Sequence, residues 1–151
     1  MRVFHARKTN RFLLDFFVQN TTMFDVEVEN SAAVEAQAES TRSGSSIWNA
    51  LLRADGKALE AIIAEHGVGI LQERGPVGEC PIHLAFLYNS PDHAEIIDII
   101  LAHDPLSVFA QYVGDEYHGE NCLHIAIINQ NLQLVQRLLG LPNSHQLLLH
   151  V

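Results

Sequence analysis

The sequence predicts an all-α solenoid of about three helix–turn–helix repeats. The main observation is a set of three apolar quartets: Ala58/Leu59/Ile62/Ile63, Ile96/Ile97/Ile100/Leu101 and Leu134/Val135/Leu138/Leu139. Each quartet has the spacing i, i+1, i+4, i+5, which places four side chains on one face of a helix. Successive quartets begin 38 residues apart. This constant interval indicates repeated units, and a lone helix pair cannot bury its apolar face without a stacked neighbour.

A shorter apolar segment ending in alanine precedes each quartet and predicts the first helix of each unit. The three segments are Ile47–Ala50 (IWNA), Ile82–Ala85 (IHLA) and Leu123–Ala126 (LHIA). Their alanines precede the quartets by 8, 11 and 8 residues, and an insertion around Ser90–Asp92 explains the longer interval. Each unit is therefore interpreted as a helix, a tight turn and a second helix.

Capping residues support these helix boundaries. Ser90 followed by Pro91 and Asp92 is a good helix start, since it offers a capping hydroxyl, a proline at the first position and an early acid. Gly140 followed by Pro142 is an equally good helix stop.

The chain is predicted to have three parts. Residues 1–45 are expected to be a poorly ordered N-terminal extension or linker, because the stretch from Glu29 to Ser46 is rich in Ser, Ala and Glu and has little to bury. Residues 46–141 are the repeat domain, and residues 142–151 are a C-terminal tail.

Composition narrows the classes of function. Nine Lys and Arg residues against 18 Asp and Glu give a net charge of -9, which argues against nucleic acid as a partner. Two cysteines are too few for a disulfide framework. The apolar runs are well short of the roughly 18 residues that span a bilayer. A reducing, cytosolic setting without a direct membrane span is the expectation.

Two eight-residue segments carry a resemblance to the ankyrin repeat. Gly78–Ala85 (GECPIHLA) and Gly119–Ala126 (GENCLHIA) resemble its signature T-P-L-H-x-A. The resemblance covers repeats at about 46–75, 76–116 and 117–141, of which the first is degenerate and has Trp48 in the place of the histidine. It implies stacked antiparallel helix pairs with long fingers projecting from one edge.

The long connectors carry a narrower resemblance. Residues 114–131 and 75–84 look like repeats of vanilloid-type TRP cation channels, closest to invertebrate sensory members. This resemblance implies a cytosolic ankyrin region that serves assembly and protein–protein interaction in a calcium-permeable channel, with no pore of its own. Its partners would include other channel subunits, and it would lie on the cytoplasmic side, associated with the membrane only through a full-length channel.

The alternative is a free-standing soluble ankyrin adaptor that binds a protein partner. Vertebrate channels of this type are associated with nucleotide and calmodulin binding on the ankyrin surface, but that site needs clustered cations. Arg53, Lys57 and Arg74 are the only ones nearby, so no cofactor is expected. The sequence also lacks a Ser-His-Asp order and a phosphate loop, and no enzymatic activity is predicted.

The candidate functional residues belong mostly to the repeat motif. The resemblance gives His83 and His124 a structural role, bonding the backbone near their helix starts, and places Ala85 and Ala126 against the paired helix. Cys80 and Asn121 replace the motif threonine, and we expect this loss of a hydroxyl to weaken the stack. Cys80, His83, Cys122 and His124 could be drawn as a zinc set, but the two cysteines occupy different motif positions.

A finger is the candidate site for a protein partner, against the simpler interpretation of a solvated turn. Its residues are Tyr112, Asp115, Glu116, Tyr117 and His118. The remaining histidines, among them His93, show no ligand spacing and are interpreted as exposed loop residues.

Overall fold

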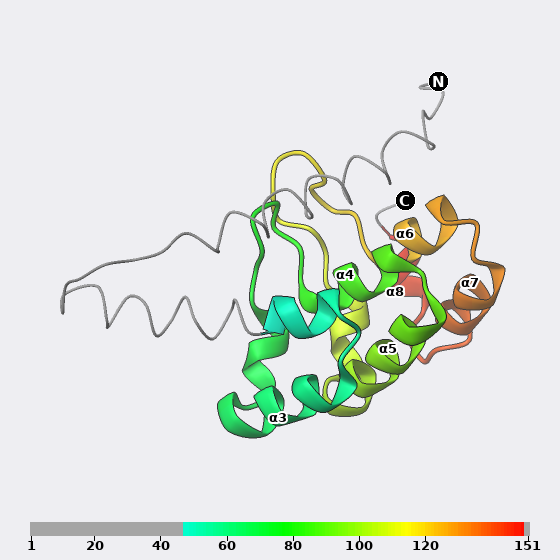
Figure 1. The fold of residues 1–151 in the computed structure, drawn as a ribbon. Helices are drawn as coiled ribbons and strands as arrows, with labels where there is room; N and C mark the ends of the chain where they lie inside the picture. The colour runs from blue at the N-terminus through cyan, green and yellow to red at the C-terminus, as the bar shows by residue number, and fades with distance from the viewer. Residues whose placement is uncertain (1–46, 150–151) are drawn as a thin grey trace.

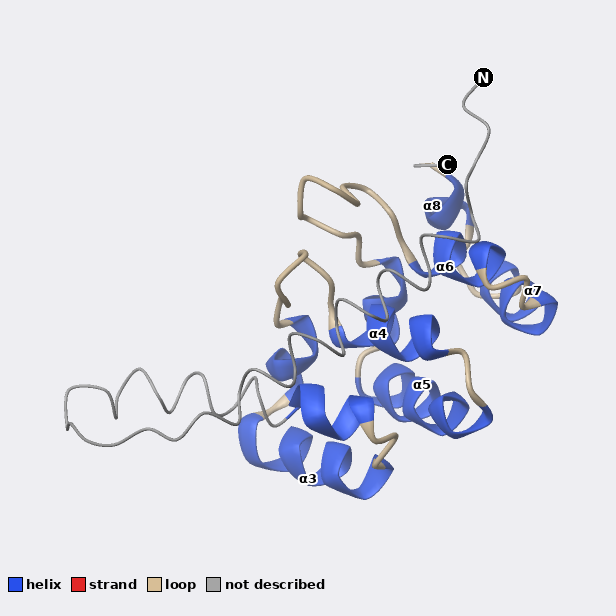
Figure 2. Ribbon diagram, turned by 45° about the horizontal axis from the view of Figure 1, so that its top comes forward, coloured by secondary structure: helices blue, strands red, loops and turns tan. Residues whose placement is uncertain are grey.

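The structure of the chain is a computed structural model, which describes residues 47–149 (Figure 1). The predicted linker at 1–45 lies outside the described residues. All regular elements between residues 47 and 149 are helical, and Figure 2 shows no strand there. The one sheet-like feature within this range is an isolated antiparallel bridge between Gln111 and Asn121. The predicted all-α class is confirmed for this part of the chain.

Between residues 47 and 149 the helices come in three consecutive pairs. Residues 47–52 are helical and form the first pair with α3 (Gly56–His66). The second pair is α4 (Pro81–Tyr88) with α5 (Pro91–His103), and the third is α6 (Cys122–Ile128) with α7 (Leu132–Leu139).

Side-chain caps explain where the second helix of each pair begins. Asp55 Oδ1 accepts the N–H of Ala58 at 3.0 Å before α3, and Asn131 Oδ1 accepts the N–H of Leu134 at 3.0 Å before α7. Ser90 caps α5, with its Oγ accepting the N–H of His93 at 3.3 Å. Each cap satisfies a backbone donor that has no partner within the helix.

A short helical turn, which the sequence pattern does not predict, follows each pair. These turns are η2 (Val68–Gln72), η3 (Pro105–Phe109) and α8 (His145–Leu148). Each turn contributes at least one fully buried side chain to the hydrophobic core. These side chains are Leu71, Val108 and Leu147, respectively. α8 falls within the segment 142–151 that was interpreted as a tail. Its one buried residue is Leu147, whereas Leu148 and Leu149 are exposed.

The core is centred on α4. This helix packs against its partner α5 and against α6 of the third pair, and α3 packs against α5. Every residue of α4 from Pro81 to Leu87 is buried. In the region described, helix pairs therefore cover one another's apolar sides.

The three quartets are not buried equally. The first two provide the core residues Leu59, Ile62, Ile63, Ile96, Ile97 and Ile100, whereas in the third only Leu138 is buried. Leu134 and Val135 are half-buried, and Leu139 is 45% exposed. The third quartet thus packs against the core through Leu134, Val135 and Leu138, but it is less covered than the first two. The physical reason is that no helix pair follows α7 within the described residues.

Two long loops project from the same side of the helices (Figure 1). The first loop is residues 73–80, between η2 and α4, and the second loop is residues 110–121, between η3 and α6. They lie beside each other, because the N–H of Val113 donates to the carbonyl of Gly78 at 3.1 Å.

Candidate interaction site

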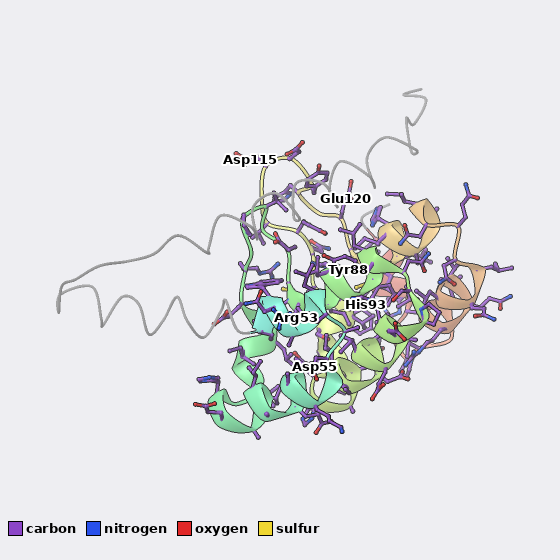
Figure 3. The ribbon with its side chains drawn as sticks, in the orientation of Figure 1. Arg53, Asp55, Tyr88, His93, Asp115 and Glu120 are labelled. Atoms are coloured by element: carbon purple, nitrogen blue, oxygen red, sulfur yellow. The ribbon has the colours of Figure 1, made fainter. Side chains whose placement is uncertain are left out.

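Backbone hydrogen bonds close the second loop into a narrow finger. The N–H of Tyr112 donates to the carbonyl of Glu120 at 2.8 Å, and the N–H of Gly119 donates back to the carbonyl of Tyr112 at 3.0 Å. A further bond joins the N–H of Glu120 to the carbonyl of Tyr117 at 2.9 Å. The tip is thus held on a short hydrogen-bonded base. Figure 3 shows Asp115 at the outer end of this loop and Glu120 nearer the helices.

The five residues predicted for partner contact divide into two groups. Asp115, Glu116 and His118 are exposed, while Tyr112 is 2% and Tyr117 is 8% exposed. Both tyrosine rings are therefore buried inside the loop, and the partner contact expected of the five residues stays a prediction. The tyrosine rings lie 5.7 Å apart, which is within the range of favourable aromatic pairs.

His83 connects the second helix pair to the second loop. Its Nδ1 accepts the N–H of Cys80 at 2.9 Å, and its Nε2–H donates to the carbonyl of Ala110 at 2.9 Å. Its ring also stacks on Tyr112 with centroids 4.4 Å apart. Burial lowers the pKa of His83 to about 4, so the ring is neutral at pH 7, with one nitrogen accepting and the other donating. These bonds are of the structural kind that the resemblance implies for this histidine.

Asn121 takes over the role of the missing hydroxyl at the equivalent place in the third pair. The N–H of Asn121 donates to His124 Nδ1 at 3.1 Å, which repeats the contact between Cys80 and His83. The Oδ1 of Asn121 accepts the N–H of Leu123 at 2.9 Å, and its Nδ2 donates to the carbonyl of Leu147 at 3.1 Å. The amide of Asn121 thus bonds both α6 and α8, and the expected weakening of the stack stays a prediction.

The two loops touch at a pair of glycines. A Cβ on Gly78 would lie 2.2 Å from the backbone nitrogen of Gly114, and a Cβ on Gly114 would lie 2.2 Å from the carbonyl oxygen of Val77. Gly78 also has φ +82°, in the left-handed region that favours glycine. Only residues without a side chain fit at this crossing.

Arg74 fastens the same crossing from outside. Its guanidinium donates to the carbonyl of Gly78 at 3.0 Å and to the carbonyl of Gln111 at 2.6 Å. Arg74 is one of the three cations considered above for nucleotide binding. In this structure its guanidinium joins the two loops.

A carboxyl group is buried under the first loop. Glu79 is fully buried, and its Oε2 accepts the N–H of Val77 at 2.9 Å, while its Oε1 has no hydrogen-bond partner. Burial raises the pKa of this carboxyl. A Cβ on Gly75 would overlap Oε1, so Gly75 makes the space that the carboxyl occupies. No pattern in the sequence had pointed to a role for Glu79.

His93 was interpreted as an exposed loop residue, and this was wrong. It is 6% exposed, stacks on Tyr88 with centroids 4.6 Å apart, and its Nε2–H donates to the carbonyl of Leu51 at 2.9 Å (Figure 3). The Ser90 hydroxyl donates to its other nitrogen at 2.6 Å. His93 thereby ties α5 to the first helix pair.

The remaining motif residues lie in the interior. Ala85 and Ala126 are fully buried, as are Cys80 and Cys122, and burial raises the pKa of both thiols. Between residues 47 and 149 there is no group of three or more His, Cys, Asp or Glu residues that could hold a metal ion.

The third helix pair, which contains His124, matches a known repeat family. The model of the ankyrin repeat matches residues 118–146, which begin in the second loop and run through α6 and α7 into α8. The chain carries an ankyrin repeat. The match includes the residues His124 and Ala126 that the signature predicted, and it ends beyond the expected boundary at 141.

No curated protein and no solved structure matches the chain. Of the helices described, none has the length and apolar character needed to cross a membrane.

The comparisons with known proteins give no support to the resemblance to vanilloid-type TRP channels.

Proposed function

We propose that the chain is a protein-binding module made of stacked ankyrin-type helix pairs, and that the tip of the second loop contacts its partner. The observation that carries this proposal is the ankyrin repeat at residues 118–146, because such repeats are generally interaction modules and not enzymes. The match begins at His118, within the exposed tip.

The proposed stack has about three repeats, one for each helix pair. The second and third pairs support it, since they share the motif Gly-Glu-x-x-x-His-x-Ala and pack directly against each other through α4 and α6. The first pair supports it through the bond from His93 to Leu51 and through the packing of α3 on α5.

The position of the tip is fixed before a partner arrives. His83 holds Ala110 at the base of the loop, the glycine crossing holds Gly114, and Arg74 joins Gln111 to the first loop. A loop whose base is held in this way has little conformational entropy to lose on binding, which favours affinity.

The chemistry of the tip favours a partner with basic side chains. Asp115 and Glu116 are exposed at the tip of a chain whose net charge is -9. The field of such a chain attracts cationic surfaces and speeds their association, and it does so less at high salt.

Matched charge variants of the full chain test this proposal. The immobilised wild type, an Asp115→Asn/Glu116→Gln variant and a Glu65→Gln/Glu95→Gln control would be exposed to the same cell extract. The control removes two exposed carboxylates from α3 and α5 and so changes the net charge equally. We expect proteins that the wild type and the control retain to fall at least about tenfold on the loop variant. Equal retention by all three proteins would contradict the role of the tip.

The broader setting of the module is part of the proposal. A cytosolic region of a vanilloid-type channel and a free-standing adaptor both fit a protein-binding function, and neither has the better support. Both place the module on the cytoplasmic side. Sequencing the transcript beyond the codon for Val151 separates them, since the channel hypothesis requires further repeats and membrane-spanning segments there.

A further inference from the structure

The buried carboxyl group of Glu79 lies in the first loop, next to the point where the two loops touch. The preceding residue is Gly78, whose carbonyl accepts the N–H of Val113 in the second loop at 3.1 Å. Glu79 itself is 0% exposed. Its Oε2 accepts the N–H of Val77 at 2.9 Å, whereas its Oε1 has no hydrogen-bond partner in the described chain. A buried oxygen without a partner makes the charged form costly, so the protonated carboxyl is enclosed more readily than the carboxylate.

The two loops close with the same pair of backbone bonds but treat this carboxyl position differently. In the first loop the N–H of Gly75 donates to the Glu79 carbonyl at 2.9 Å, and the N–H of Gly78 donates back to the Gly75 carbonyl at 3.0 Å. The second loop repeats both bonds, with Tyr112 in the place of Gly75. Its glutamate, Glu120, is only half-buried. A Cβ at position 75 would overlap Oε1, so the glycine there is what allows Glu79 to be enclosed.

The titratable groups around Glu79 come from both loops and from α4. Arg74 of the first loop is the cation among them, and its attraction favours the ionised carboxyl. Burial raises the pKa of the Tyr112 hydroxyl in the second loop and of the Cys80 thiol before α4, so both are neutral at pH 7. His83, which stacks on Tyr112, is neutral there too. Burial of Glu79 outweighs its two backbone hydrogen bonds and the attraction of Arg74, and it raises the pKa of this carboxyl above the ordinary 4.5.

We propose that Glu79 makes the contact between the two loops sensitive to pH. The protonated carboxyl keeps the first loop closed, with Gly78 against the second loop. Ionisation favours an open first loop in which the carboxylate reaches water, and the bonds from Val77 to Oε2 and from Val113 to the Gly78 carbonyl are lost. The contact is tightest below pH 4.5 and loosens as the pH rises towards the raised pKa of Glu79. This inference concerns the loops themselves, so it goes beyond the binding function and does not depend on it.

Hydrogen exchange of the full chain tests this pH dependence. The wild type, Glu79→Gln and the control Glu73→Gln would be compared at each pH, so that the intrinsic effect of pH on exchange cancels. Glutamine has the shape of the protonated side chain and cannot ionise, and the control removes another carboxylate of the same loop. We expect the exchange rate of the Val113 amide, taken as the ratio of wild type to Glu79→Gln, to rise at least about threefold from about pH 5 to about pH 8. The control should follow the wild type. A ratio that stays constant or falls would overturn the proposal.

A second pair of variants tests whether the enclosure is the cause. Gly75→Ala would displace the carboxyl without removing it, while the control Gly69→Ala places its Cβ where nothing lies within 4 Å. We expect Glu79→Gln to keep its pH-dependent effect on exchange when it is added to Gly69→Ala, and to lose it when it is added to Gly75→Ala. The same effect in both backgrounds would overturn the proposal.

Titration of the carboxyl itself needs no substitution. Nuclear magnetic resonance of the wild type with isotopically labelled glutamate follows the side-chain carbon of Glu79 as the pH changes. We expect a midpoint above 4.5, and a lower midpoint in Gly75→Ala. A wild-type midpoint at or below 4.5 would show that the enclosed carboxyl does not favour its proton, and the proposal would fail.

Discussion

The second and third helix pairs begin with nearly the same eight residues, yet the structure uses them differently. His83, Glu79 and Phe86 in the second pair are all fully buried. Their counterparts in the third pair are less enclosed: His124 and Glu120 are half-buried, and Ile127 is 52% exposed. Similar motifs thus begin both helices but are buried unequally, because only the second pair has helix pairs on both sides in the described region. How deeply a motif residue is buried in this fold therefore depends on the place of its helix pair in the stack.

The largest effect should come from the apolar residue that follows the motif. We expect Phe86→Ala to lower the free energy of unfolding by about 3–5 kcal/mol, since it opens a cavity beneath α6, and Ile127→Ala to cost less than about 1 kcal/mol. Urea titration followed by circular dichroism measures both. Similar losses for the two variants would mean that the third pair is as enclosed as the second.

The pH dependence of stability should single out His83. Because its pKa is about 4 in the folded chain and about 6.5 when unfolded, the unfolded state binds more protons between these values. The stabilisation due to the neutral ring is complete above pH 6.5 and is lost as the pH falls towards 4, by about 3 kcal/mol. Titration of Glu79 acts in the opposite direction, since a raised carboxyl pKa favours the folded state at low pH.

The variant His83→Asn isolates this contribution, because it keeps Glu79 and removes the titrating ring. We expect the difference in unfolding free energy between wild type and variant to shrink between pH 7 and pH 4. A difference that stays constant over this range would show that His83 does not titrate with a lowered pKa.

The next largest effect on stability is expected at two equivalent glycines, which can be compared directly. Gly78 and Gly119 are equivalent in the motif and have φ of +82° and +86°, but a Cβ on Gly119 would meet nothing within 4 Å. Gly119→Ala should cost about 1–2 kcal/mol from backbone strain alone. Gly78→Ala should cost about 1–3 kcal/mol more, because its Cβ would overlap Gly114. Thermal melts of the two variants measure the difference, and equal melting temperatures would argue against the crossing of the loops.

The smallest effect is expected at the surface ion pair between the outer helices. Arg137 and Asp98 join α7 to α5, but their side chains are 41% and 61% exposed. We expect Arg137→Gln to lower the unfolding free energy by no more than about 0.5 kcal/mol, and less in high salt. A loss above 1 kcal/mol by urea titration would show that this pair, and not only the packing of α4 on α6, holds the second and third pairs together.

The sequence was informative where a pattern extends over several turns of helix. The quartets located α3, α5 and α7, and Ser90 marked the start of α5, because a helical period and a cap are local properties. It did not reveal η2, η3 and α8, since four or five residues are too few to show a period. The burial of His93 and Tyr112 also escaped prediction, because it depends on residues up to 42 positions away.

Residues of α4 and α5 form hydrogen bonds with residues both earlier and later in the chain. His93 reaches back to Leu51, while His83 reaches forward to Ala110 and the Phe86 carbonyl receives Asn129. Opening this region therefore breaks contacts in both of its neighbours, whereas α7 can open at smaller cost. In native-state hydrogen exchange, the amides of α4 should be the slowest in the described chain, and protection should decline towards α7 and α8.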